Sequence, residues 1–196
     1  KKQEYIQGAG GNTSIKLDEN IMAIKSSGIK LKNILKKTGI SNIKYKDLNY
    51  KLNTNKKFFL NNSFENFNLN KIYRASMETV FHSLLGSAVI HTHSVYINTI
   101  LCSYEGKKII SKLFPTSYWA NYYTPGLDIT LRIQKIVKNI KNIRVKNVVF
   151  FLENHGIIVS SKNFKNAINL HEKINKKIIH EFNLSKYNDF KNYEKQ

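Results

Sequence analysis

Residues 148–160 read VVFFLENHGIIVS and carry the clearest signal of secondary structure in the chain. The unbroken apolar run 148–152 predicts a strand that is buried on both faces. The turn at residues 154–156 separates it from a second apolar run, 157–160, which predicts the returning strand. This hairpin places one histidine, His155, in the turn between two buried strands.

Elsewhere the chain alternates between strand and helix patterns. Alternating apolar residues and β-branched runs predict short strands at residues 15–17, 22–24 and 88–93. Apolar residues at helical spacing predict helices at residues 76–85, 127–140 and 163–182. We expect Ser76 to cap the start of the first helix and Gly86 to stop it.

Two regions give weaker patterns. Residues 97–101 and 108–113 look helical or mixed, and residues 32–70 read as loop and short helix with a possible strand at 58–60. No internal repeat or break in composition divides the chain. We therefore predict a single α/β domain over residues 1–185, followed by a polar tail over residues 186–196.

The composition is that of a globular protein. Hydrophobic residues make up 41% of the 196 residues and charged residues 23%, which excludes a wholly disordered chain. The single cysteine, Cys102, excludes an intramolecular disulfide framework. No apolar run approaches the roughly 18 residues of a membrane span, and the first residues do not resemble a signal peptide. We expect a cytoplasmic protein without a membrane segment.

The formal charge of +19 suggests a nucleic-acid partner, but the kinds of basic residue that produce this charge argue against one. Of the 32 basic residues, 29 are Lys and only 3 are Arg, whereas nucleic-acid binders usually rely on Arg for bidentate contacts. Lys, Asn and Ile together make up 79 of the 196 residues, and all three have A/T-rich codons. We attribute the charge to codon bias and expect no specific nucleic-acid binding.

A candidate metal site follows from the histidines. His91 and His93 lie at the end of a predicted strand, where side chains at i and i+2 point to the same face. Their Cα atoms should lie about 6–7 Å apart, which is close enough for both imidazoles to bind the same divalent ion. If the hairpin pairs beside this strand, His155 supplies a third nitrogen, as in catalytic zinc sites with one open position. Taken alone, the pattern also fits two ordinary polar residues at a strand end.

Glu78 lies near the start of a predicted helix, one turn before His82 on the same face. A carboxylate in this position can interact favourably with the helix dipole and have no other role. It can also act as a general base against a metal-bound substrate. Spacing alone leaves both interpretations open.

Six motifs occur in an order that resembles the class II aldolase/adducin family, which includes fuculose- and rhamnulose-phosphate aldolases and ribulose-5-phosphate 4-epimerase. The resemblance covers about residues 5–180. The motifs are Gly11-Asn12-Thr13-Ser14, Ile24-Lys25-Ser26-Ser27-Gly28, Glu78-x-x-Phe81-His82, Val89-Ile90-His91-Thr92-His93-Ser94, Tyr122-Tyr123-Thr124-Pro125-Gly126 and Glu153-Asn154-His155-Gly156. The resemblance implies a three-layer αβα fold with a central, mainly antiparallel sheet, assembled as a homotetramer with sites between subunits.

The resemblance also implies roles for particular residues. His91, His93 and His155 would hold Zn²⁺ or another divalent metal, and Glu78 would be the catalytic acid/base. Tyr122 would be a catalytic acid reaching a neighbouring subunit, although the alignment leaves Tyr123 possible. The expected substrate- and phosphate-binding residues are Asn12, Ser27, Gly28 and Ser76, which supply the hydroxyls and turn N–H groups that anions favour.

Two departures from the fuculose-type aldolases concern the substrate. Met77 follows Ser76 where those enzymes have paired serines, so one phosphate hydroxyl is lost. The interval between His82 and His91 is also shorter. Glu78 favours the aldolase branch over the epimerases, which carry Asp there. His171 and His180 fall outside the motifs, and we expect surface or packing roles for them.

The resemblance therefore implies a zinc-dependent aldolase-like lyase. It would cleave or form a C–C bond in a small, phosphorylated sugar through a zinc-stabilised enediolate. Two alternatives remain at this point: a sugar-phosphate epimerase that works by retro-aldol chemistry, and an adducin-like binding module without catalysis. Intact His91, His93, His155 and Glu78 argue against the binding module.

Overall fold

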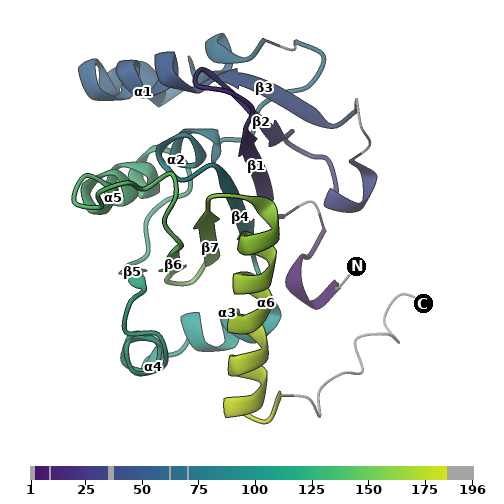
Figure 1. The fold of residues 1–196 in the computed structure, drawn as a ribbon, viewed down its shortest axis with the longest axis vertical. Coiled ribbons are helices and arrows are strands. Elements are labelled where there is room, and N and C mark those ends of the chain that lie inside the picture. Colours follow the sequence, from purple (N-terminus) through teal and green to yellow (C-terminus); the bar gives the residue numbers. More distant parts are fainter. Residues whose placement is uncertain (1–2, 9, 35–37, 62, 70, 185–196) are drawn as a thin grey trace.

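The computed structural model describes residues 3–8, 10–34, 38–61, 63–69 and 71–184. Its centre is one seven-stranded sheet with the strand order β3-β2-β1-β4-β7-β6-β5 (Figure 1). The strands are β1 (Asn12–Lys16), β2 (Ile21–Lys25), β3 (Ile40–Lys44), β4 (Ala88–Thr92), β5 (Tyr118–Ala120), β6 (Val148–Leu152) and β7 (Gly156–Ser161). All neighbouring pairs are antiparallel except β5 and β6, which run parallel.

Helices cover both faces of the sheet. The α-helices are α1 (Tyr45–Thr54), α2 (Thr79–Leu84), α3 (Val95–Leu101), α4 (Gly106–Leu113), α5 (Leu127–Val137) and α6 (Phe164–Glu181). Four short 3-10 helices complete the described secondary structure: η1 (Gln3–Tyr5), η2 (Leu31–Asn33), η3 (Lys56–Asn61) and η4 (Ser63–Phe67).

The alternation of side chains along the central strand β4 explains the three layers. Ile90 belongs to a core with residues of α3, α4 and α6 on one face of the sheet, whereas Val89 packs with residues of α2 and α5 on the other. A third cluster packs α1 against β2 and β3. Full burial of side chains such as Phe150 and Ile158 stabilises this arrangement by about 1.5–3 kcal/mol each. The predicted αβα fold with a mainly antiparallel sheet is confirmed.

Several element predictions need correction. Residues 58–60 lie in the 3-10 helix η3, not in a strand, because Phe59 packs with the α1 cluster and pairs with no strand. The sequence analysis does not predict the short strands β3 and β5, whereas the helix α1 falls in the region that it reads as loop and short helix. The helix expected from Ser76 begins at Thr79, with Glu78 at its N-cap, and the helix expected to reach residue 140 ends at Val137.

The hairpin β6–β7 and the final helix lie where the sequence predicts them. The division into a domain over residues 1–185 and a tail stays a prediction, since residues 186–196 lie outside the described part of the chain. Within the described residues, no helix combines the length and the apolar character needed to cross a bilayer.

Candidate metal centre

The centre of the sheet brings the predicted histidines together. His91, on β4, pairs with Asn12 of β1 on one side and with Ile158 of β7 on the other. Because β4 and β7 are antiparallel, the end of β4 lies beside the start of β7, where the turn from β6 carries His155. The hairpin therefore pairs beside the His91-x-His93 strand, as the sequence argument required.

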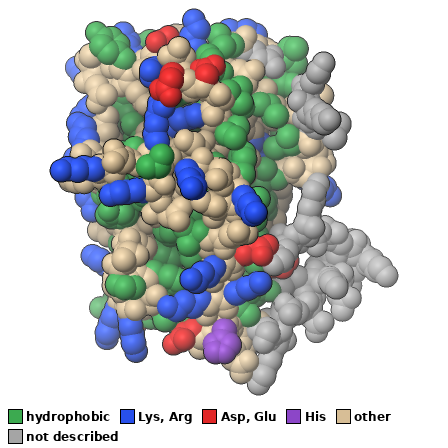
Figure 2. Space-filling view, in the orientation of Figure 1, with side chains coloured by type: hydrophobic (Ala, Val, Ile, Leu, Met, Phe, Trp, Pro, Cys, Tyr) green, Lys and Arg blue, Asp and Glu red, His purple; other side chains and the backbone are tan. Residues whose placement is uncertain are grey.

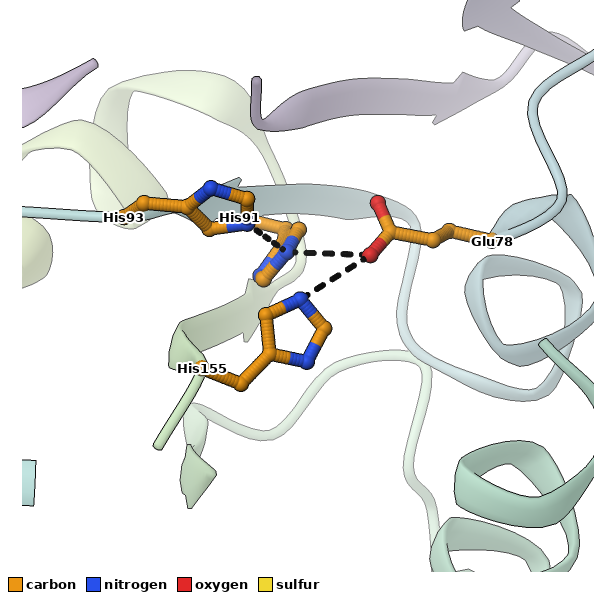
Figure 3. A group of neighbouring side chains, drawn as sticks. All are labelled: Glu78, His91, His93 and His155. Carbon is orange, nitrogen blue, oxygen red and sulfur yellow. Dashed lines mark hydrogen bonds and ion pairs between the residues drawn. The ribbon is translucent and has the colours of Figure 1, made fainter. Parts of the chain in front are cut away.

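The three imidazoles face a common point (Figure 3). Their ring centroids lie 4.8, 4.9 and 5.0 Å apart, and His93 Nε2 is 3.0 Å from His91 Nε2. His91 Nδ1–H donates to the carbonyl of Ile157 at 3.0 Å, which leaves Nε2 as the nitrogen with a free lone pair. That tautomer directs the ligand atom of His91 toward the other two rings.

Glu78 closes the fourth side of this group. Its Oε1 lies 3.2 Å from His91 Nε2 and 3.3 Å from His155 Nε2. One ligand atom from each of Glu78, His91, His93 and His155 lies within 4.8 Å of all the others. We call these four residues the His/Glu cluster.

Burial and mutual charge perturb this cluster. Burial alone would raise the pKa of Glu78, but the adjacent His91 and His155 outweigh it and hold this pKa well below its usual range. Burial opposes protonation of His91, yet the Glu78 carboxylate raises its pKa. His93 has its pKa lowered to about 4 by burial and by the two neighbouring imidazoles. The cluster thus combines an ionised carboxylate with at least one neutral imidazole at neutral pH.

The donor set fits a divalent metal ion. Three imidazole nitrogens are the ligands of many catalytic zinc sites, and a nearby carboxylate can complete the coordination or stand aside for substrate. Without a cation, two imidazole nitrogens at 3.0 Å can only share a proton or repel each other. The four residues are therefore able to hold a metal.

Asn12 and Ser76 lie against the carboxylate. The Asn12 amide Nδ2 donates to Glu78 Oε2 and, at 3.1 Å, to Ser76 Oγ. Ser76 Oγ also accepts the Glu78 backbone N–H at 3.3 Å. Ser76 thus anchors the residue at the N-cap of α2, and both side chains fix the orientation of Glu78.

Ser27 and Gly28 lie at the exposed tip of the loop after β2. The Ser27 N–H donates to the carbonyl of Arg74 at 2.8 Å, which ties this loop to the segment leading into Ser76. The four residues predicted to bind a phosphate therefore belong to segments that adjoin one another beside Glu78. Their part in phosphate binding stays a prediction.

Tyr122 lies on the loop between β5 and α5. Its side chain is 57% exposed and that of Tyr123 is 37% exposed, and no hydrogen bond from either hydroxyl reaches the cluster among the described residues. The Tyr122 N–H donates to the Glu153 carboxylate at 2.7 Å, so the tyrosine loop is joined to the turn that carries His155. Glu153 was missed as a supporting residue, although it stands in the same motif as His155.

Two further buried groups support the centre. His82 is fully buried, and burial lowers its pKa to about 3, so the ring is neutral. Its Nδ1 lies 2.8 Å from Ser14 Oγ, which connects α2 to β1. His171, expected in a surface or packing role, is 5% exposed, and its Nε2 lies 2.7 Å from Thr92 Oγ1, between the two strand-end histidines.

Gly11 and Gly156 allow the backbone to close around the cluster. A Cβ at Gly156 would lie 2.4 Å from the Thr92 carbonyl oxygen. A Cβ at Gly11, which has a φ of +71°, would lie 2.7 Å from the His91 carbonyl oxygen. Glycine is therefore required sterically at both positions.

Comparison with solved structures supports the same fold. The chain is similar to the N-terminal class II aldolase domain of a conserved protein from Thermoplasma acidophilum, with 20% identity, a TM-score of 0.76 and coverage of 92% of this chain and 87% of that one. A sugar-phosphate aldolase from Thermotoga maritima gives 13% identity, a TM-score of 0.59 and coverage of 92% and 88%. L-fuculose-1-phosphate aldolase from Thermus thermophilus gives 15% identity, a TM-score of 0.55 and the same coverage.

No curated protein matches the chain closely enough to count as a relative. Its sequence does match a family described as Class II Aldolase and Adducin N-terminal domain, over residues 1–177. This match covers most of the chain and includes every residue of the His/Glu cluster. The chain belongs to the class II aldolase and adducin N-terminal domain family.

Proposed function

We propose that this protein is a zinc-dependent, aldolase-like lyase that acts on a small phosphorylated sugar. The observation that carries the proposal is the His/Glu cluster, in which three imidazoles and one carboxylate converge. Several structural neighbours are named as sugar-phosphate or fuculose-phosphate aldolases, which supports this reaction class. A binding module without catalysis would have no need for a buried carboxylate against the imidazoles.

In the proposal, His91, His93 and His155 hold the metal, which we take to be zinc. A divalent ion bound there would polarise a substrate carbonyl and stabilise negative charge on its oxygen. Each imidazole must offer a neutral nitrogen, and the Ile157 carbonyl keeps His91 in the required tautomer.

Glu78 is the proposed acid/base. Its depressed pKa keeps it ionised at neutral pH, so in the direction of bond formation it can accept a proton from the carbon next to the carbonyl. Asn12 holds one carboxylate oxygen through its amide, which leaves the other to face the imidazoles and the substrate. That carbon then attacks the aldehyde carbon, and the aldehyde oxygen takes a proton from an acid on the aldehyde side. In the direction of cleavage that hydroxyl gives its proton back as the carbon–carbon bond breaks, and Glu78 returns a proton to the carbon next to the carbonyl.

Tyr122 is the proposed acid on the aldehyde side. Since its side chain is exposed and no hydrogen bond joins its hydroxyl to the His/Glu cluster among the described residues, we propose that it serves the site of a neighbouring subunit in a homotetramer. Asn12, Ser27, Gly28 and Ser76 are proposed to bind the substrate phosphate. We also propose a cytoplasmic location, as a chain with one cysteine needs no oxidising compartment.

Metal analysis combined with a screen of ketose phosphates tests this proposal. We expect about one zinc, or another divalent ion, per chain, and release of an aldehyde from at least one ketose phosphate. His93→Ala should lose the metal, whereas His180→Ala, which removes an imidazole on α6 outside the cluster, should keep it. Metal retained at one per chain in the triple His91→Ala/His93→Ala/His155→Ala variant would overturn the site. Inversion of a carbinol centre without aldehyde release would identify an epimerase instead.

A further inference from the structure

His93 lies one residue beyond the sheet, so strand pairing does not fix its direction. β4 ends at Thr92, and the pair of Thr92 with Ile157 is the last one that β4 makes with β7. The pairing of β4 with β1 already ends at His91, opposite Asn12. A ligand side chain that is not held in advance costs free energy to order when the metal binds. The direction of His93 therefore depends on contacts outside the sheet.

The two neighbours of His93 in the chain are held by α6. Thr92 Oγ1 lies 2.7 Å from His171 Nε2, and the Ser94 hydroxyl donates to Asn175 Oδ1. His171 and Asn175 stand four residues apart in α6, so their side chains share one face of the helix. All four side chains that form these contacts are buried. We call Thr92, Ser94, His171 and Asn175 the α6 clamp.

The α6 clamp has one defined arrangement. Asn175 Nδ2 donates to the carbonyl of His171 at 2.9 Å, which leaves Oδ1 to accept from Ser94. The His171 ring packs edge-on against Tyr5, with the ring centroids 5.2 Å apart. The carbonyl of Ser94 accepts the Asn98 N–H at 2.8 Å, so Ser94 is also fixed by the first turn of α3. Breaking one of these buried hydrogen bonds leaves a polar group without a partner, which is costly.

The α6 clamp and the His/Glu cluster lie on opposite sides of this segment. His91 contacts Glu78, whereas the next side chain, Thr92, contacts His171, because successive side chains of a strand point to opposite faces. The His93 ring returns to the side of His91, with the centroids of the two rings 4.8 Å apart. A hold on both neighbours from behind therefore directs the His93 imidazole forward.

We propose that His171 and Asn175 are positioning residues for His93: by tying Thr92 and Ser94 to α6, they turn the His93 imidazole toward the His/Glu cluster. The inference rests on the proposed function in one respect, since it takes His93 to be a metal ligand. It gives α6, a helix outside the cluster, a part in metal binding.

Three variants of the full chain test the inference. His171→Phe keeps an aromatic ring against Tyr5, and Asn175→Leu keeps a side chain of similar size; each removes one hydrogen bond of the α6 clamp. The matched control is Asn163→Ala, which weakens the start of the same helix and leaves the clamp in place. Zinc affinity is measured by competition with a chromophoric chelator, the coordination of the metal by visible absorption of Co²⁺ in the same site, and folding by thermal denaturation.

We expect each clamp variant to bind zinc about tenfold more weakly, since partners that orient a metal ligand contribute on that order. The Co²⁺ absorption should shift and weaken in both variants, because His93 no longer holds its place in the coordination shell. Asn163→Ala should lower the melting temperature and change zinc affinity by less than about twofold, because distant sites act independently. Clamp variants that lose thermal stability but keep the zinc affinity and Co²⁺ spectrum of the control would show a purely structural role and overturn the inference.

NMR of the metal-free protein separates this inference from the proposed function. The rings of His91 and His93 are close enough for proton cross-relaxation, which the clamp variants should lose and the control should keep. If the wild type binds no zinc, the proposed function is overturned, and the cross-relaxation alone judges the clamp. Equal cross-relaxation in all proteins overturns the clamp and leaves the proposed lyase intact. If His171→Phe or Asn175→Leu does not fold, Thr92→Val breaks the clamp from β4, with Thr92→Ser, which keeps the hydroxyl, as its control.

Discussion

Single contacts decide which chemistry the centre can perform. The Ile157 carbonyl fixes the tautomer of His91, and the Asn12 amide fixes the direction of the Glu78 carboxylate. Both contacts come from strands that flank β4, so they depend on strand register and not on the local sequence. A shift of β1 by one residue would turn the Asn12 side chain to the other face of the sheet, away from Glu78.

Glu78→Gln tests the acid/base role at this scale. The amide keeps the size of the side chain but cannot accept a proton, so we expect proton exchange to fall by about 10²–10⁴-fold. Deuterium exchange into a bound ketose, followed by NMR, measures this step without full cleavage. Equal exchange rates in wild type and variant would remove Glu78 from the mechanism.

Metal content serves as the control for that variant. An amide oxygen at position 78 can still approach the imidazoles, so Glu78→Gln should retain the metal through His91, His93 and His155. If Glu78→Gln loses both the metal and the deuterium exchange, Glu78 is instead an essential metal ligand.

At the scale of elements, the ends of helices hold the site in place. The end of α2 is anchored by Lys16 of β1, whose ammonium donates to the carbonyls of Leu85 and, at 3.0 Å, Gly86. Lys16 also lies 5.0 Å from the centroid of the Tyr45 ring, with Arg144 on the same ring at 5.5 Å. Since α2 follows directly on Glu78, this anchor helps to place the carboxylate.

Lys16 predicts a particular pH dependence of stability. Burial, and then the charge of Arg144, lower its pKa from 10.5 to about 7 in the folded protein. Below about pH 7 the lysine is protonated in both states, and folding carries the cost of the buried charge. Between about pH 7 and 10.5 the unfolded chain binds the proton more strongly, so the contribution of Lys16 to stability rises with pH.

Urea denaturation of wild type and Lys16→Met at several pH values measures this effect. The stability of the wild type relative to the variant should increase from about pH 7 to about pH 9.5. Lys44→Met, which removes an exposed lysine from β3, should show no such trend. A difference between wild type and Lys16→Met that does not change with pH would contradict the prediction.

The start of α6 gives a second prediction about an element. The Asn163 side-chain oxygen accepts the Asn166 N–H at 2.9 Å, which satisfies one of the free donors of the first turn. Asn163→Ala should reduce the free energy of unfolding by about 0.5–2 kcal/mol. Chemical denaturation measures it, and Asn163→Asp, which keeps an acceptor, should retain most of the stability.

At the scale of the whole molecule, the formal charge of +19 is the most conspicuous property of the chain. Figure 2 shows Lys and Arg side chains dispersed over the visible face among hydrophobic and uncharged groups. A nucleic-acid site usually gathers such charges along one stripe or groove. The dispersed distribution on this face agrees with the interpretation that codon usage sets the lysine content.

Binding to DNA or RNA should therefore be weak, nonspecific and sensitive to salt. Counterion release predicts that six or more phosphate contacts lose on the order of 10³-fold or more in affinity between 50 and 200 mM salt. Fluorescence anisotropy with two unrelated sequences measures both the salt slope and any preference. Tight, sequence-selective binding at about 200 mM salt would show that the basic surface has a function of its own.

The sequence by itself determined the elements with strong local patterns and the residue types of the centre. The apolar runs of β6 and β7 and the helical spacing of α6 suffice, because burial of a continuous face leaves few alternative conformations. The i, i+2 spacing of His91 and His93 predicted that their side chains meet, and they do so although β4 ends at Thr92, one residue before His93. The order of the motifs identified the family, which the family match confirms.

The tertiary structure decided what depends on partners distant in sequence. The strands β3 and β5 lack a strong pattern of their own, and they form because β2 and β6 offer an open edge for pairing. Glu78 and His155 lie far apart in the sequence, yet their side chains meet because β7 pairs with β4 and α2 packs beside it. Lys25 is buried only because the loop after β2 folds around its ammonium. Such contacts arise from packing and register, which a single sequence does not display residue by residue.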